Sequence, residues 1–325
     1  MKRLALILLG FVVVIGLAGG GAYFYGRARF HAPGPLAAAR NVVVVAGSLA
    51  AVAEQLEHDG VIEDAREFRV AASLTKGEGG IRSAELAFPS QASLQQVLAV
   101  LRTGKPVQHL LTIPEGLTVK QIALLLEKTE SLTGAPQLVG EASILPETYA
   151  YEYGMARAAI VERGRRALTR AMADLWEKRS PGLPISSPAQ ALILASIVER
   201  ETSKADERPH VAAVFYNRMR LGMKLQSDPT VVYAASQGLG SLDRPISRAD
   251  LDRDDPYNTY KIAGLPPSAI CAPGLASIRA VLSPAKSEDL YFVADGSGGH
   301  VFARTLEEHN RNVAKWRARS SGGTN

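Results

Sequence analysis

The sequence predicts an α+β fold that follows an N-terminal membrane-spanning helix. Three observations carry this prediction: an uncharged apolar run near the N-terminus, several capped segments with helical spacing of apolar residues, and a few short β-branched runs. The chain has 325 residues, of which 46% are apolar and 21% charged, and these are ordinary globular values. A largely disordered or low-complexity chain is therefore excluded.

The composition and the absent motifs also limit the partners, metals and cofactors that we expect. The formal net charge is +5, but lysine and arginine are scattered and form no basic stripe, so we predict no nucleic acid partner. The single cysteine, Cys271, can form neither an internal disulfide nor a cysteine-based zinc site. The sequence has no HExxH, G-x-S-x-G or dinucleotide-binding motif, and we predict no metal and no cofactor.

Residues 4–25 form the predicted transmembrane anchor, because an uncharged helix of this length spans a hydrocarbon core of about 30 Å. Lys2 and Arg3 precede the run, so residues 1–3 are predicted to be cytoplasmic. A cleaved signal peptide is the alternative, with small residues at 19–22 near the cut. Residues 26–40 contain an Ala-Pro-Gly-Pro stretch and are predicted to be a linker.

A repeated spacing marks residues 41–130. Ser48, Ser93 and Thr118 are each followed by apolar residues at positions +4, +5 and +8, as in a short amphipathic helix with a hydroxyl N-cap. Ser93 and Thr118 also have glutamine three residues later, which completes a capping box. With a preceding strand at 42–45, this pattern predicts a small LysM-like module. Ordinary capped helices of an α+β domain remain the alternative.

The larger domain is predicted over residues 131–318, and its most informative helix covers 188–203. The apolar stripe of that helix contains Leu194 and Ile197, and the next position on the same face is Glu201. A carboxylate on a buried face must be paired or must hold its proton. A carboxylic acid with a raised pKa is the group that protonates a leaving sugar oxygen.

The alternative interpretation of Glu201 is a structural ion pair with Arg208 or Arg218. Glu199 points to another face of the same helix and is expected to be a solvated surface charge.

Polar and aromatic residues lie on predicted loops after a helix over 207–221. Residues 226–230 are predicted to form one such loop, and residues 256–267 include another rich in proline. Amides, carboxylates and aromatic rings suit sugar binding, which makes candidates of Gln226, Asp228, Asn258 and Tyr260. Simple turn chemistry explains the same residue types equally well.

The C-terminal part has clear local signals. Residues 290–294 and 300–303 are predicted strands joined by a glycine-rich hairpin turn at 295–299. Thr305 and Glu308 form a capping box for a last helix that ends near residue 317, and residues 319–325 are expected to be a disordered tail.

Several of these stretches together resemble the YceG-like family of lytic transglycosylases. They are TIPEG at 112–116, LPETY at 145–149, ASIVERET at 195–202, LQSDPTVVY at 225–233, PYNTYKIAGLPP at 256–267 and ADGSGGHVFA at 294–303. The resemblance covers about residues 42–317. It implies an endolytic enzyme that cleaves the β-1,4 bond between N-acetylmuramic acid and N-acetylglucosamine in peptidoglycan and leaves 1,6-anhydro ends.

The resemblance implies that Glu201 is the catalytic acid and then the base. Glu141 and Glu147 match acidic positions of the family near the LPETY motif, and they join Gln226, Asp228, Asn258 and Tyr260 as substrate-binding candidates. Glu147 stands where aspartate is commoner in the family.

Together with the predicted anchor, the resemblance indicates a single-pass protein of the inner (cytoplasmic) membrane with its catalytic domain in the periplasm. Its implied partners are nascent peptidoglycan strands and peptidoglycan synthases, and its implied role is to terminate strand elongation. Two alternatives stay open at this point: a muramidase that hydrolyses the same bond, and a non-catalytic peptidoglycan-binding scaffold.

Overall fold

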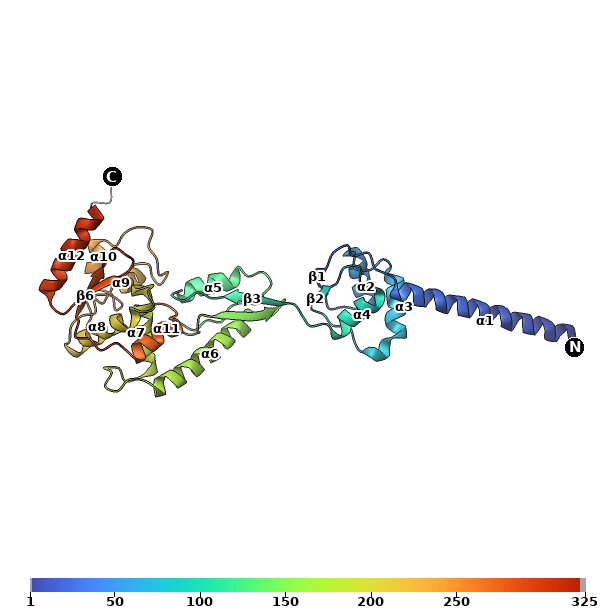
Figure 1. Cartoon of the computed structure of the whole chain (residues 1–325), viewed down its shortest axis with the longest axis horizontal. Coiled ribbons are helices and arrows are strands. Elements are labelled where there is room, and N and C mark those ends of the chain that lie inside the picture. The colour runs from blue at the N-terminus through green and yellow to red at the C-terminus, as the bar shows by residue number, and fades with distance from the viewer. Residues whose placement is uncertain (1, 322–325) are drawn as a thin grey trace. The chain divides into compact units, whose positions relative to one another are not determined.

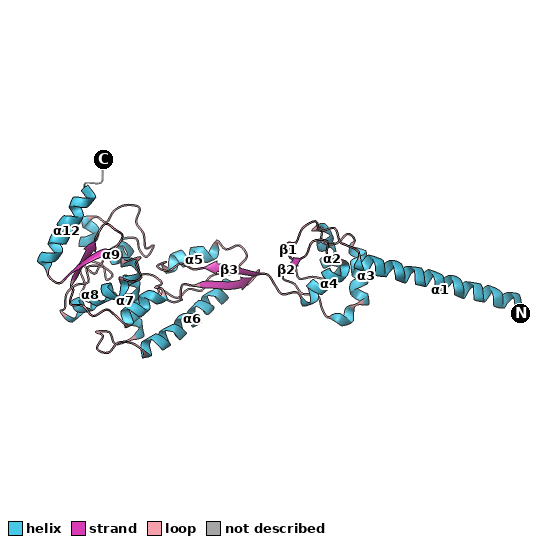
Figure 2. Cartoon of the chain, in the orientation of Figure 1, coloured by secondary structure: helices cyan, strands magenta, loops and turns pink. Residues whose placement is uncertain are grey.

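The computed structural model describes residues 2–321 and contains two compact units, Met1–His109 and Leu110–Asn325 (Figure 1). Helices dominate both units, and the strands are short and pair two by two (Figure 2). The predicted mixed α+β class is therefore confirmed. Each unit has its own hydrophobic core, and the two units are described separately.

The first unit begins with the predicted apolar helix. Its elements, in chain order, are α1 (Lys2–His31), β1 (Arg40–Val43), α2 (Leu49–His58), α3 (Ala65–Leu74), the 3-10 helix η1 (Lys76–Glu78), β2 (Glu85–Phe88) and α4 (Leu94–Thr103). Residues Leu6–His31 of α1 are long and apolar enough to cross a membrane, with a mean hydropathy of 2.2 and no part of that window buried in the protein. A signal sequence has the same composition, so the anchor remains one of two compatible interpretations.

The predicted linker at 26–40 is more ordered than expected. Helix α1 continues through residue 31, because the chain has no proline before Pro33. Leu36 is buried in the first core, and Gly34 passes so close to the Ala92 carbonyl that a side chain would not fit there.

A two-stranded antiparallel sheet and three helices enclose the core of the first unit. Val42 of β1 lies opposite Leu86 of β2, and both are buried. The expected N-caps are present: Ser48 caps α2, and Ser93 forms a complete capping box with Gln96 on α4.

The third capped helix belongs to the second unit. Thr118 caps α5 (Val119–Glu127) with a full capping box, as predicted. However, Ile122 and Leu126 of α5 pack with Leu132 and Ile144, whereas the sequence placed the module boundary at 130. The structure draws this boundary at His109, because the apolar face of α5 is buried against residues that follow it in the chain.

The second unit holds two apolar clusters. Its elements are β3 (Gln108–Thr112, which begins at the boundary), α5, β4 (Thr148–Glu152), α6 (Arg157–Glu177), α7 (Pro188–Glu201), α8 (Arg208–Arg220), α9 (Asp228–Ala235), α10 (Arg248–Asp252), α11 (Leu275–Leu282), β5 (Tyr291–Ala294), β6 (His300–Ala303) and α12 (Leu306–Ser321). One cluster surrounds the β3–β4 pair and α5. The other packs residues of α6, α7, α8 and α11 together and includes the buried Tyr216.

The C-terminal prediction is confirmed for the described residues. Strands β5 and β6 form an antiparallel hairpin in which Tyr291 lies opposite Ala303. Thr305 and Glu308 exchange backbone and side-chain hydrogen bonds at the start of α12. This helix extends to residue 321, beyond the predicted end, and the rest of the predicted disordered tail, 322–325, lies outside the described residues.

Candidate active site

Helix α7 carries Glu201 at its last residue. The helix starts at Pro188, and the Ser187 side chain accepts a hydrogen bond from the Gln190 backbone, so the N-terminus of the helix is capped. Leu194 and Ile197 are fully buried in the core of the second unit. The same face carries Glu201 to the edge of that core, where its side chain is partly accessible.

The surroundings of Glu201 favour its protonated form. Removal from water raises the pKa of its carboxyl to about 7, and the charge of Asp228 adds to that rise. The Ser227 hydroxyl donates a hydrogen bond to Oε1 and opposes the rise, as does the positive charge of Arg218. No ion pair to Glu201 occurs within residues 2–321, so the structural alternative, a salt bridge with Arg208 or Arg218, is wrong for this structure.

Ser227 is one of the site residues that were not predicted from the sequence. It occupies the N-cap position of α9, yet its side chain makes no capping bond because its hydroxyl is directed to Glu201. The expected loop at 226–230 is wrong in its second half: α9 begins at Asp228, with Pro229 in its first turn, where proline is tolerated. The signal was present in the sequence, since Ser-Asp-Pro is a typical helix start.

The chain before Ser227 is held in an uncommon conformation. Gln226 has a φ of 51°, in the left-handed region that a non-glycine residue adopts at a cost of about 1–3 kcal/mol. Thr259 holds this segment: its carbonyl accepts from the Gln226 backbone at 3.1 Å and its hydroxyl accepts from the Ser227 backbone at 2.9 Å. The buried Thr230 hydroxyl contacts the Thr259 hydroxyl at 2.8 Å. Ser227 is therefore positioned by its backbone as well as by its side chain.

Glu201 opens into a pocket of about 320 Å³. Four of the lining residues are predicted site residues: Glu201, Gln226, Asp228 and Tyr260. The remaining lining residues were not predicted: Arg218, Leu225, Tyr291, Phe292, Leu306 and His309. One acid thus shares a pocket with a second carboxylate, a cation, amide and imidazole groups, and three aromatic rings.

Asp228 and Tyr260 form one wall. The Tyr260 hydroxyl donates to Asp228 Oδ1 at 2.7 Å, and burial raises the pKa of Tyr260, so the phenol stays neutral. Asp228 is the second carboxylate of the pocket and is exposed to solvent. Asp228 therefore places a negative charge near Glu201 while its own carboxylate stays in contact with solvent.

Arg218 forms another wall and has a structural role. Its Nε donates to the Leu290 carbonyl at 2.6 Å and its Nη1 to the Leu225 carbonyl at 2.7 Å. Its guanidinium lies 5.3 Å from the centre of the Tyr291 ring, within cation–π range. Arg218 thereby ties α8 to the chain entering β5 and to the segment before Gln226.

His309 of α12 completes the described lining. Burial and the charge of Arg218 lower the pKa of its imidazole, so the ring is neutral at pH 7. The ring stacks on Tyr291 at 5.2 Å, and its Nδ1 is buried with no hydrogen-bond partner in the described chain. Sequence spacing could not predict that His309 lies near Glu201, because the two residues are 108 positions apart.

Three predicted site residues lie elsewhere. Asn258 is fully buried and donates to the carbonyls of residues 250, 251 and 253, so it is a structural residue and does not line the pocket. Glu141 is half-buried and accepts from the Val119 backbone at 2.8 Å, and burial raises its pKa. Glu147 is exposed on the segment before β4. Neither glutamate is among the residues that line the Glu201 pocket.

Glu199 is not the solvated charge that the sequence suggested. Its side chain is 5% exposed, pairs with Arg208 at 2.9 Å and accepts from the Gly274 backbone at 2.9 Å. Arg208 also lies 3.6 Å from Glu115 of the TIPEG stretch. The arginine considered as a partner of Glu201 therefore belongs to Glu199, and the pair fixes the last turn of α7 against α8 and the start of α11.

The fold and the site define a mixed α+β protein with one acid of raised pKa, Glu201, in a polar, aromatic pocket. A YceG-like family model matches residues 42–315, so the chain belongs to the YceG-like family. The resemblance seen in the sequence is confirmed.

The similar proteins have a consistent name. The endolytic murein transglycosylase of Bacillus subtilis is 28% identical over 331 residues, which cover 91% of this chain and 90% of that protein. The endolytic murein transglycosylase of Streptococcus pneumoniae strain D39 is 27% identical over 94% of this chain, which spans 64% of the pneumococcal protein. A solved YceG-like protein of Listeria monocytogenes has a TM-score of 0.54 and 28% identity, over 84% of this chain and 98% of its own. These curated relatives are lytic transglycosylases, a class of lyase.

Proposed function

We propose that this chain is an endolytic lytic transglycosylase of peptidoglycan and that Glu201 is its acid and its base. The observation that carries the proposal is the state of Glu201, a carboxyl with a pKa near 7 and no ion pair in the described chain, at the wall of a pocket. A pKa near the working pH suits a group that must give and then take a proton. The family and the names of the relatives supply the substrate class.

In the proposed reaction, Glu201 donates its proton to the oxygen of the bond between N-acetylmuramic acid and N-acetylglucosamine. The bond from the muramic C1 to that oxygen breaks, and the C6 hydroxyl of the same muramic residue forms a new bond to C1. Its proton passes to the Glu201 carboxylate, which restores the acid. No water is consumed, and the intramolecular attack gains its rate from proximity.

The other lining groups support this chemistry. Ser227 holds the Glu201 carboxyl in one orientation, and the rings of Tyr260, Tyr291 and Phe292 offer faces on which sugar rings can stack. Gln226 and the neutral His309 supply uncharged polar groups for sugar hydroxyls and amides. Asp228 is the observation that favours a second candidate function, a hydrolase, because glycoside hydrolysis ordinarily uses two carboxylates.

Digestion of purified glycan strands by the full-length chain in detergent tests the proposal, with products identified by mass spectrometry. The transglycosylase predicts internal fragments with anhydro ends, one water lighter than reducing ends, and no product from Glu201→Gln. Hydrated ends would favour the hydrolase. Equal products from both chains would overturn the role of Glu201, and no products from either would favour the non-catalytic scaffold.

We further propose a setting for this activity. Helix α1 would anchor the chain in the inner membrane with its N-terminus in the cytoplasm and the second unit in the periplasm, next to nascent strands and their synthases. Cleavage there would terminate strand elongation. A fusion of alkaline phosphatase to the C-terminus should be active in cells if this orientation is right, and a cytoplasmic reporter should be active if it is reversed.

We also propose that the first unit binds glycan as a LysM-like module. Its β1–α2–α3–β2 order, with an antiparallel β1–β2 pair, supports this. Deleting residues 41–105 from the Glu201→Gln chain should reduce its retention on insoluble peptidoglycan, and unchanged retention would contradict the proposal.

A further inference from the structure

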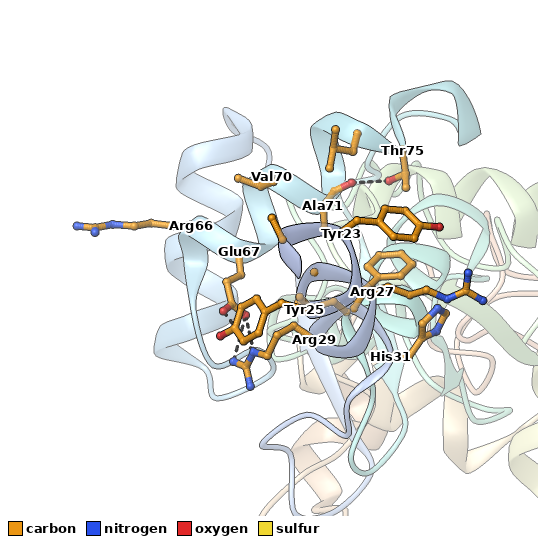
Figure 3. Close-up of a pocket in the computed structure, with 15 residues that line it drawn as sticks. Tyr23, Tyr25, Arg27, Arg29, His31, Arg66, Glu67, Val70, Ala71 and Thr75 are labelled. Carbon is orange, nitrogen blue, oxygen red and sulfur yellow. Dashed lines mark hydrogen bonds and ion pairs between the residues drawn. The ribbon is translucent and has the colours of Figure 1, made fainter. Parts of the chain in front are cut away.

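A groove of about 630 Å³ lies in the first unit, where the end of α1 runs beside α3 (Figure 3). Its apolar lining comes from both helices, with Tyr23 and Phe30 on α1 and Val70 and Leu74 on α3. Leu74 is 82% exposed and Val70 is 60% exposed. An apolar face of this kind is typical of a surface that is covered in use.

The groove is built on a fixed contact between the two helices. The Arg29 side chain donates to Glu63 at 2.8 Å and to Glu67 at 3.1 Å. These two ion pairs hold the end of α1 against the start of α3. The apolar faces of the two helices therefore border one groove.

The position of the groove along α1, relative to the end of the predicted membrane span, indicates what occupies it. A hydrocarbon core of about 30 Å takes about 20 helical residues, so a span that begins at Leu4 ends near Tyr23. The groove is lined by α1 residues from Ala22 to His31, which begin where that span ends. It therefore lies at the boundary between acyl chains and headgroups, where tyrosine is also favoured.

The charges at the groove match this position. Arg27 and Arg66 border the groove and extend to either side of it (Figure 3). Neither forms an ion pair in the part of the chain that the structure describes. Two cations beside an apolar groove are complementary to the phosphate and the acyl chain of a phospholipid.

We propose that this groove binds an anionic phospholipid of the outer face of the membrane and holds the first unit on the bilayer surface. The proposal rests on the membrane span of α1 proposed above. The acyl chain would lie between Tyr23 and Leu74, and the headgroup phosphate would lie near Arg66, on that side of the groove. The first unit would then touch the membrane through α3 as well as through its anchor.

Spin labels on the full-length chain test this in nanodiscs of phosphatidylcholine and phosphatidylglycerol. The native Cys271 is buried, so an introduced cysteine is the one exposed thiol in the described chain. Labels at Leu74→Cys, at Val14→Cys within the span and at the 86% exposed Val139→Cys are compared by their accessibility to oxygen and to a water-soluble nickel complex.

We expect the position 74 label to resemble the position 14 label, with oxygen access and little nickel access, and the position 139 label to show the reverse. A position 74 label open to nickel, with position 14 in the bilayer, would overturn the groove proposal and leave the span intact. Both labels open to nickel would overturn the span and the groove proposal together. A position 74 label closed to both reagents would show that a protein covers the groove, which also overturns the proposal.

The charge requirement has a matched control on the same helix. We expect Arg66→Gln to lower the preference for spin-labelled phosphatidylglycerol over phosphatidylcholine by about fivefold, since a basic residue near an anionic surface contributes about that factor. Arg69 lies on α3 but does not line the groove, and Arg69→Gln should leave the preference unchanged. Equal effects of the two substitutions would contradict a specific lipid site.

Discussion

The Ser227 hydroxyl donates a hydrogen bond to Oε1 of Glu201 and so leaves the N-terminus of α9 without its side-chain cap. A serine at this position ordinarily stabilises its own helix by about 1 kcal/mol. Here the hydroxyl instead orients the Glu201 carboxyl in the pocket. The same bond lowers the pKa of Glu201 and partly offsets the effect of burial.

The alkaline limit of activity should move when this bond is removed. The acid form of Glu201 is the active one at bond cleavage, so kcat/KM should fall as pH rises through a pKa of about 7. Ser227→Ala removes an interaction that favours the carboxylate, so the limit should move to higher pH. The pH profile of glycan cleavage measures this shift, and a limit that moves to lower pH would contradict the assignment.

Substitution of Asp228 is expected to move the alkaline limit of activity in the opposite direction. Its negative charge raises the pKa of Glu201, so Asp228→Asn should move the alkaline limit to lower pH. A second result separates the two candidate reactions: the transglycosylase keeps activity within about tenfold of the parent, whereas a hydrolase that needs this carboxylate loses at least about a hundredfold. Initial rates across pH with the same glycan strands give both numbers.

Glu199 should matter for stability. Its removal in Glu199→Ala leaves Arg208 buried with only the half-exposed Glu115 nearby, and breaking such a buried pair costs about 3–5 kcal/mol. Both tryptophans, Trp176 and Trp316, lie in the second unit, so their emission in urea reports its unfolding. The exposed Glu147→Ala is the control and should change stability by less than about 0.5 kcal/mol.

Asn258 should also behave as a structural residue. Its amide nitrogen donates to three backbone carbonyls and its oxygen accepts from the Tyr260 backbone at 3.0 Å. Asn258→Ala should therefore destabilise the second unit by about 1–3 kcal/mol and leave KM for glycan unchanged in the folded enzyme. A raised KM with unchanged stability would restore the sugar-binding role that its sequence context suggested.

The parts of the site that the sequence predicted are those with local signals. Helical spacing placed Glu201 on a buried face because residues 194, 197 and 201 share one side of a helix. The same helical spacing placed Glu199 on another face of the helix. It could not show that Glu199 pairs with Arg208 and accepts a hydrogen bond from the Gly274 backbone. Residue type suggested Asn258 as a sugar ligand, but only tertiary structure shows that it is enclosed.

The remaining walls come from distant parts of the chain. Tyr291 and His309 reach the pocket through the β5–β6 hairpin and α12, whose elements were predicted but whose docking was not. The boundary between the two units, at His109, differs from the predicted module boundary at residue 130 for a similar reason. The apolar face of α5 is covered only when residues such as Leu132 and Ile144 pack on it. Capping and periodicity specify elements, whereas long-range packing decides which elements share a core.

The most direct test of the central claim is digestion of glycan strands by the full-length chain in water enriched in oxygen-18. If Glu201 directs the C6 hydroxyl to C1, the new ends carry no oxygen-18 and are one water lighter than reducing ends. Products that carry one oxygen-18 at the new end would show that water attacks C1. That result would contradict the single-carboxylate transglycosylase and assign the second carboxylate, Asp228, to a hydrolase.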